Sequence, residues 1–162
     1  MPDVSQDLLD ALSAMPEVFE ALLDGCTQEQ AGAARGGDEG WSVVEVVCHL
    51  RDAEERALER MRLMRDNDNP FIAAYDQEAW ARDRNYAAAD LRATLAAFNR
   101  FRSQHVAELA RLSPDQWERP GRHEERGRIT ISSHTLHMVA HDAIHAAQVA
   151  RQLRGEYAQN PG

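Results

Sequence analysis

Apolar residues recur at intervals of three and four along residues 4–24, where Leu8, Leu12, Phe19 and their neighbours form one stripe. That spacing places them on a single face of an amphipathic helix. Pro16 lies inside the stripe, and its missing N–H predicts a kink or a split at that point. The glycine-rich stretch that follows, residues 25–40, is expected to be a loop after a short turn.

Three further stretches have helical patterns and clear start signals. Ser42 and Glu45 have the spacing of a capping box, so the second helix is expected to begin there and to end near Asp66, at a run of Asp, Asn and Pro. The third helix is expected over residues 90–112, capped by Asp90. The fourth is expected from a cap at Thr130 to about residue 154, where Gly155 follows.

The connections between these helices differ in length. Residues 70–89 are aromatic and polar together and predict an irregular crossover, whereas residues 113–117 predict a short turn and residues 118–129 a charged loop. No segment has the alternating pattern of a strand. We therefore expect a single all-α domain over residues 1–162, a four-helix bundle with a long crossover between the second and third helices.

Composition narrows the class of protein. The chain has 162 residues, 43% of them hydrophobic, and a formal net charge of −9. A domain this acidic is a poor partner for nucleic acid, because phosphate contacts dominate that affinity. Arg56, Arg60, Arg62 and Arg65 form the most basic stretch, but the glutamates among them indicate a solvated helix face with ion pairs along it.

The sequence also predicts the cellular compartment of the protein. It has no run of eighteen apolar residues, so no membrane span is expected. The acidic, amphipathic N-terminus is unlike a secretory signal. Cys26 and Cys48 are too few for a disulfide framework, so we expect a protein of the reducing cytoplasm.

Histidines supply the candidate chemistry. His134, His137, His141, His145 and Gln148 follow one another at spacings of 3, 4, 4 and 3, where a bundle helix normally carries leucine or valine. A polar stripe aimed at water would cost nothing. A polar stripe that faces the core carries a free-energy cost of desolvation, unless its side chains form hydrogen bonds or bind a metal. Histidine is an unusual choice for a solvated face, which favours the second interpretation.

The expected ligands are His141 and His145, one helical turn apart, with His49 from the second helix. Such a facial set of three nitrogens leaves coordination positions open for water or substrate. His137 is a candidate fourth ligand or supporting donor, and Gln148 a candidate supporting residue. Three neutral nitrogens suit zinc, nickel, copper or iron(II), and the order of affinities alone does not choose among these metals. His105 and His134 are expected at the surface or in the core, and His123 in a loop.

One further motif carries less weight. The string HDAIH, residues 141–145, is similar to the metalloprotease motif H-E-x-x-H with Asp142 in place of the glutamate. Aspartate is one methylene shorter and would draw the base away from a bound water. Asp142 is instead expected to orient a neighbouring group or to cap a surface.

These motifs resemble the DinB/YfiT superfamily of four-helix-bundle metalloproteins. Residues 41–54, WSVVEVVCHLRDAE, are similar to its second-helix signature with His49 at a ligand position, and residues 141–148, HDAIHAAQ, to its fourth-helix signature. Further matches follow the order of its DinB_2-like branch: Pro70-Phe71, Tyr75-Asp76, Trp80, Phe101-Arg102, Trp117 and Gly127. The chain departs from many members at Ala146-Ala147, which bears on the pocket and not on the metal.

The resemblance implies an antiparallel bundle of unusual connectivity, a divalent metal (typically zinc or nickel) and often a homodimer. It also implies activities such as thiol-dependent transfer or isomerisation with bacillithiol, mycothiol or glutathione, although some relatives have no established activity. We therefore expect a metal-dependent enzyme acting on a small molecule, with thiol S-transfer as the most specific reaction and hydrolysis as another.

Several side chains are expected near such a site. Tyr75, Asp76, Trp80 and Arg102 would shape a pocket above the metal, or else serve ordinary packing and surface pairing. Asp52 would accept a hydrogen bond from a ligand imidazole or face solvent. The main alternative function is a non-catalytic metal-binding protein of the stress response, whose site would be fully closed by protein ligands. A helical protein that binds no metal is the third reading.

Overall fold

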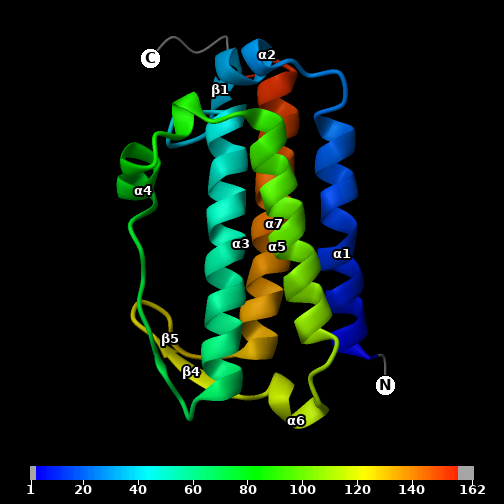
Figure 1. Ribbon diagram of the computed structural model, residues 1–162, viewed down its shortest axis with the longest axis vertical. Coiled ribbons are helices and arrows are strands. Elements are labelled where there is room, and N and C mark those ends of the chain that lie inside the picture. Colours follow the sequence, from blue (N-terminus) through cyan, green and yellow to red (C-terminus); the bar gives the residue numbers. More distant parts are fainter. Residues whose placement is uncertain (1–2, 157–162) are drawn as a thin grey trace.

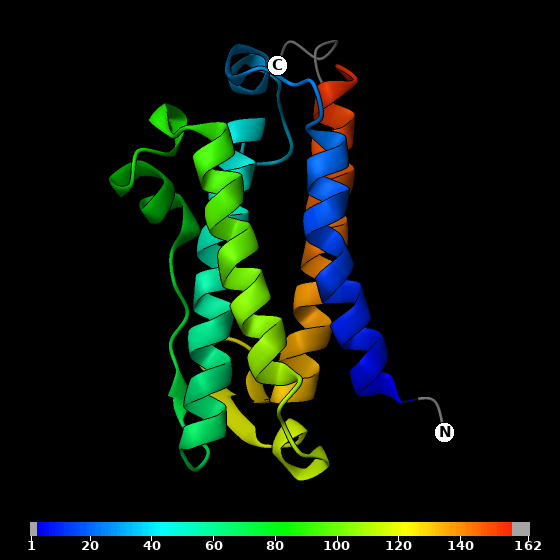
Figure 2. The same ribbon diagram turned by 45° about the vertical axis from the view of Figure 1, so that its right-hand side comes forward.

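Four long helices form the body of the computed structural model, which describes residues 3–156 (Figure 1). They are α1 (Val4–Leu22), α3 (Val43–Asp66), α5 (Leu91–Leu109) and α7 (Ile131–Leu153). Helices α1 and α7 run in one direction, and α3 and α5 run in the other (Figures 1 and 2). The parallel α3 and α5 are joined by the long crossover along the outside of the bundle, as the sequence predicted.

The predicted caps define where these helices begin. Ser42 and Glu45 form a complete capping box at the start of α3, and Thr130 forms another with Ser133 at the start of α7. Asp90 accepts a hydrogen bond from a backbone amide in the first turn of α5. Each side chain satisfies a donor that the first turn of a helix leaves free, so local sequence is sufficient to place these starts.

The predicted split of the first helix is wrong, because α1 continues through Pro16. A proline removes one N–H, which frees the carbonyl oxygen four residues earlier. In this chain that oxygen belongs to Leu12, and Nη1 of Arg102 on α5 donates to it at 3.0 Å. A side chain from another helix therefore replaces the hydrogen bond that the proline cannot make.

The connections hold more structure than the sequence indicated. The segment expected as a loop before α3 contains α2 (Gln28–Ala33) and an antiparallel pair of short strands, β1 (Arg35–Gly36) and β2 (Trp41–Ser42). The crossover contains β3 (Phe71–Ile72), α4 (Gln77–Asp83) and the 3-10 turn η1 (Tyr86–Ala88). The short helix α6 (Pro114–Trp117) occupies the predicted turn.

The segment predicted as a charged loop, residues 118–129, is instead mostly a hairpin of β4 (Pro120–His123) and β5 (Gly127–Thr130). Strand β3 pairs with β4 in parallel, so the hairpin is tied to the crossover. The strands are too short and too polar for an alternating pattern, and β3 pairs with a strand about 50 residues further along the chain. The hairpin and the start of the crossover lie at one end of the bundle, beside α3 (Figure 1).

The core lies between the four long helices and consists mainly of the buried apolar faces of α1, α3 and α5. Helix α7 contributes less to the core, because its apolar residues Leu136 and Ile144 are 58% and 66% exposed. Its inward face is largely polar. Among the described residues, no helix combines the length and the apolar character that crossing a membrane requires.

Candidate metal centre

Three histidines from two antiparallel helices converge in the half of the bundle where α3 begins. His49 lies in the second turn of α3, and His141 and His145 occupy successive turns of α7. The Nε2 atoms of His49 and His141 are 2.9 Å apart. One ring nitrogen from each of the three lies within 4.8 Å of the others. The structure therefore brings together the three residues that the sequence selected.

The surroundings keep these imidazoles neutral. His49 and His145 are buried, and His141 is partly buried. Burial, followed by the nearby ring of His145, lowers the pKa of His49 to about 3, and the same two causes lower the pKa of His141 well below its usual value. Burial also lowers the pKa of His145. Each ring thus offers a lone pair at neutral pH, which is the form that binds a metal.

Gln148 orients one of the three rings. Its Oε1 atom lies 2.9 Å from Nδ1 of His145, and because an amide oxygen only accepts hydrogen bonds, that nitrogen donates. The proton is therefore on Nδ1, and Nε2 of His145 carries the lone pair. This is the usual way in which a neighbouring residue selects the tautomer of a metal ligand. Gln148 thus lies where a supporting residue was expected.

Two residues that the sequence did not single out complete this side of the site. Gly37, between β1 and β2, has a φ of +75°, and a Cβ atom there would lie 2.5 Å from Nε2 of Gln148. Only glycine leaves room for the amide in that backbone conformation. Trp41 is buried and packs against His49, with the centroids of the two rings 5.2 Å apart. Neither role has a local sequence signal.

The donor atoms suit a divalent cation. Within residues 3–156, Nδ1 of His49 and Nδ1 of His141 are buried and have no hydrogen-bond partner, and the only hydrogen-bonding contact of the two Nε2 atoms is with each other. Facing Nε2 atoms can be reconciled by one N–H···N hydrogen bond or by a shared cation. Zinc–nitrogen bonds of about 2.0–2.1 Å put neighbouring ligand nitrogens roughly 3 Å apart. The spacing of His49 and His141 fits that geometry.

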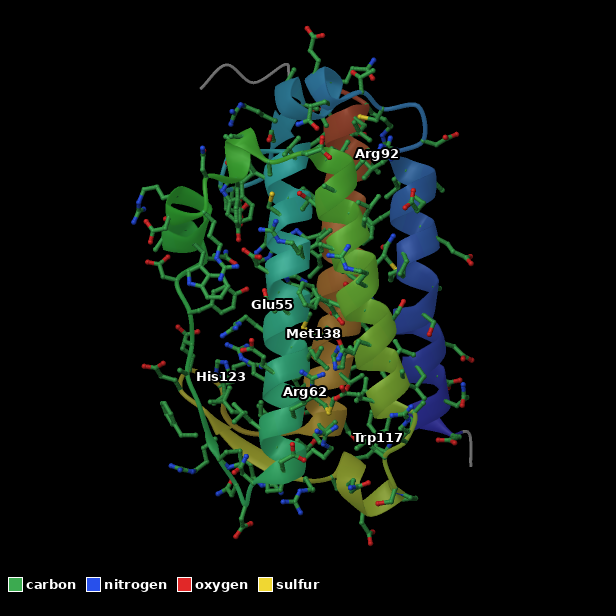
Figure 3. The ribbon with its side chains drawn as sticks, viewed as in Figure 1. Glu55, Arg62, Arg92, Trp117, His123 and Met138 are labelled. Carbon is green, nitrogen blue, oxygen red and sulfur yellow. The ribbon has the colours of Figure 1, made fainter. Side chains whose placement is uncertain are left out.

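A cavity of about 260 Å³ adjoins the cluster on the side of the crossover and the hairpin. His49 and His141 line its inner wall, with Met138 of α7 below them. The outer wall comes from α3, the crossover and the hairpin, through Arg60, Tyr75, His123 and Arg126 among others. Figure 3 shows His123 on the hairpin side of α3, and Met138 on the other side of α3, towards α5 and α7. The cluster therefore has one side open to a space for a small molecule.

Only some of the residues that were predicted to line a pocket border the cavity. Tyr75 lines the cavity, as expected. Asp76 instead caps α4 by accepting hydrogen bonds from two backbone amides. Trp80 stacks between Tyr75, at 4.7 Å between ring centroids, and the guanidinium of Arg84 at 4.0 Å. Asp76 and Trp80 thus build the wall that carries Tyr75 and do not border the cavity themselves.

Arg102 is the clearest correction, because it lies in the centre of the bundle and not above the histidines. It is 1% exposed, and its guanidinium donates two hydrogen bonds to Asp142, at 2.8 and 2.9 Å, and one to Glu54 at 2.9 Å. Asp142 therefore orients a buried neighbour, the first of the two roles expected for it. Glu54 also contacts Nδ1 of His105 at 2.7 Å.

Asp52 takes neither of its expected roles. Its carboxylate is fully buried and does not contact a ligand imidazole. It accepts hydrogen bonds from the hydroxyl of Tyr86 and from the guanidiniums of Arg51, at 2.9 Å, and Arg84, at 3.0 Å. Asp52 joins α3 to the crossover, and so helps to hold the outer wall of the cavity.

The other histidines lie outside the cluster. His137 is exposed and lines the cavity, with its ring centroid 6.4 Å from that of His141, so it is not grouped with the three ligand nitrogens. His105 and His134 are buried in the core, one of the two places expected for them. His123 is buried in β4 rather than in a loop.

Comparison with known proteins identifies the family to which this chain is similar. The model of the DinB superfamily matches residues 11–149. YfiT of Bacillus subtilis is 27% identical over 149 residues, which cover 90% of this chain and 83% of YfiT. A protein of Oceanobacillus iheyensis is also 27% identical, over 146 residues that cover 85% of this chain and 83% of that protein. The names of both propose a metal-dependent hydrolase.

The solved structure of YfiT has the same fold. It superimposes with a TM-score of 0.88 at 24% sequence identity, covering 97% of this chain and 90% of YfiT. YfiT is described there as a probable metal-dependent hydrolase with an unusual four-helix bundle topology. The parallel pair α3 and α5, joined by a crossover, agrees with that likeness, and the family model spans all four long helices of the bundle. The chain belongs to the DinB superfamily.

Proposed function

We propose that the protein is a metal-dependent hydrolase of a small molecule, and that His49, His141 and His145 hold the divalent cation. The observation that carries the proposal is the convergence of three neutral ring nitrogens beside an open cavity. The names of the relatives support hydrolysis as the reaction. Zinc or nickel is the expected metal, and three nitrogen ligands are also compatible with iron, manganese or copper.

The incomplete set of protein ligands favours catalysis over a structural role. Among the described residues, the cluster contains three potential ligands and no fourth His, Cys, Asp or Glu. Structural zinc sites are normally closed by four protein ligands, whereas catalytic sites keep a position for water or substrate. This difference counts against the alternative of a purely metal-binding stress-response protein.

A bound divalent cation would polarise a substrate carbonyl and lower the pKa of water at that position. The chain's own residues prepare the site for this chemistry. Gln148 holds His145 in the required tautomer, and Trp41 packs against His49 without lining the cavity. His137 borders the cavity, and burial lowers its pKa, so its imidazole is neutral and able to accept a proton.

The first test is metal content. Protein purified without an affinity tag is expected to bind one divalent ion per chain, measured by plasma mass spectrometry and by titration of metal-free protein. His49→Ala, His141→Ala and His145→Ala should each lose stoichiometric binding, because two imidazoles no longer form a facial set. His137→Ala is the matched control and should keep it. Unchanged binding by His141→Ala would contradict the assignment.

The second test is the reaction itself. A panel of small esters and amides should be hydrolysed by the metal-loaded protein and not by His141→Ala. The narrower reaction, S-transfer from a low-molecular-weight thiol, is tested by adding glutathione and an electrophile to the same preparations. Turnover that requires the thiol would replace hydrolysis as the assigned reaction. Turnover equal in the wild type and in His141→Ala would contradict both.

A further inference from the structure

Two arginines border the cavity beside the histidine cluster without a carboxylate partner. Arg60 comes from α3, and Arg126 from the turn between β4 and β5. Neither lies within 4.0 Å of a carboxylate among residues 3–156 (the salt bridges of this range involve other arginines). Nη2 of Arg60 donates to the backbone oxygen of Ala73 at 2.9 Å, and Nη2 of Arg126 lies 3.4 Å from Nδ1 of His134.

Arg60 differs in this respect from its neighbours on α3. With a formal net charge of −9, the protein has carboxylates in excess, and the neighbours of Arg60 on the same helix use them. Arg56 pairs with Glu59, and Arg62 pairs with Glu108 of α5. The expectation that all four arginines of this stretch form a solvated, paired face is therefore wrong for Arg60, which turns towards the cavity.

The two guanidiniums are held in an unfavourable electrostatic environment. Arg60 is partly buried and Arg126 is largely exposed; partial burial lowers the pKa of both, and the positive charge of Arg126 lowers that of Arg60 further. Burial, and after it the charges of these two arginines, lower the pKa of His123 and His137, which also line the cavity. Glu125, which also lines the cavity, offsets part of this positive charge without pairing with either arginine. An oxyanion in the cavity would relieve the repulsion.

We infer that the substrate carries an anionic group, a carboxylate or a phosphate, and that Arg60 and Arg126 bind it. A guanidinium presents paired donors that match the two oxygens of such a group. The cavity, at about 260 Å³, limits the substrate to a small molecule. The inference rests on the proposed function for the reaction, but the binding of the anion depends on the two arginines alone.

The binding test is therefore made in protein that lacks the proposed metal site. In a His141→Ala background, metal-free, we would titrate inorganic phosphate in one arm and succinate in the other by calorimetry. The double variant Arg60→Gln/Arg126→Gln should weaken binding of at least one anion at least tenfold. Arg128→Gln removes an exposed arginine two residues from Arg126 that does not line the cavity, so it should change binding less than twofold. The weakened arm identifies carboxylate or phosphate as the recognised group.

The catalytic test uses wild-type background and two esters with the same leaving group, 4-nitrophenyl acetate and 4-nitrophenyl hydrogen succinate. Wild type and Arg128→Gln should prefer the anionic ester in kcat/KM, and the double variant should lose that preference with its melting temperature unchanged. Anion binding that needs both arginines without any hydrolysis would support this inference and reject the proposed function. Equal anion binding by the double variant and Arg128→Gln would overturn the inference, whatever the activity.

Discussion

At the scale of single residues, the site depends on a glycine that carries no chemistry. Gly37 lets the amide of Gln148 approach, and Gln148 selects the tautomer in which Nε2 of His145 is free. A chain of two contacts thus connects a turn before α3 to a ligand on α7. Supporting residues of this kind commonly change metal affinity about 10–100-fold when they are removed.

We predict that Gly37→Ala weakens zinc binding by about tenfold or more, because the new methyl group displaces the amide of Gln148. Competition with a chromophoric chelator measures the affinity. Gly40→Ala is the matched control: Gly40 has a similar φ of +67°, but a Cβ atom there meets nothing within 4 Å. Both variants carry the same backbone strain. Equal losses of affinity in the two would show that strain, not the contact with Gln148, is responsible.

At the scale of the helices, Arg102 joins all four. From α5 it bonds to Glu54 of α3, to Asp142 of α7 and to the Leu12 oxygen that Pro16 frees in α1. All three charged groups are at most 1% exposed. Removing one partner from a buried, hydrogen-bonded ion pair leaves an uncompensated charge in the interior, which is far more costly than losing a surface pair.

Arg102→Met is therefore expected to lower the free energy of unfolding by about 3–5 kcal/mol. Urea denaturation followed by circular dichroism measures it. Arg62→Met, which breaks a more exposed pair with Glu108 between the same two helices α3 and α5, should cost about 0–1 kcal/mol. The interpretation of Arg102 as the central tie of the bundle fails if the two variants lose similar amounts.

At the scale of the whole molecule, the same network makes stability depend on pH. Burial opposes ionisation of Glu54, but Arg102 and His105 outweigh it and lower the pKa of Glu54 from about 4.5 to about 2. A carboxyl whose pKa is lower in the folded state stabilises the fold above its unfolded pKa and loses that effect as the pH falls. A shift of this size is worth on the order of 3 kcal/mol.

We accordingly expect the stability difference between wild type and Glu54→Gln to be constant near neutral pH and to shrink as the pH falls below about 4.5. Urea denaturation of both proteins from pH 7 to pH 3.5 measures the difference. Asp142 acts in the opposite sense, because burial raises its pKa and the charge of Glu54 adds to that rise, so its contribution must be measured separately with Asp142→Asn. A difference that stays the same over this range would contradict the assigned pKa of Glu54.

The connectivity of the whole bundle also creates the cavity. Because α3 and α5 are parallel, the chain must return along the outside of the bundle, and β3 of that return pairs with β4 of the hairpin (Figures 1 and 2). These two segments supply the outer wall beside the histidines. The homodimer and the cytoplasmic location expected from the sequence stay predictions, which sedimentation and fractionation of cells would check.

The sequence by itself determined the four helices, most of their ends and the three histidines that converge. Helix starts depend on residues within one turn, as at Ser42 and Thr130, and the relation of His141 to His145 is a property of any helix. His49 required more than periodicity, since it lies 92 residues from His141; it was selected as a histidine of the second helix, and the resemblance in its flanking residues supported that choice.

Only the tertiary structure decided what surrounds those histidines. Arg102 and Asp52 satisfy their charges with partners distant in sequence, and a local pattern cannot distinguish such residues from pocket residues. Strand β3 pairs with β4 from a segment about 50 residues away, and the local hairpin of β4 and β5 is too short and too polar for an alternating pattern, so residues 118–129 were predicted to be a loop. Packing likewise decides that Arg60 faces the cavity. In the sequence, Arg60 cannot be distinguished from the arginines near it that form ion pairs at the surface.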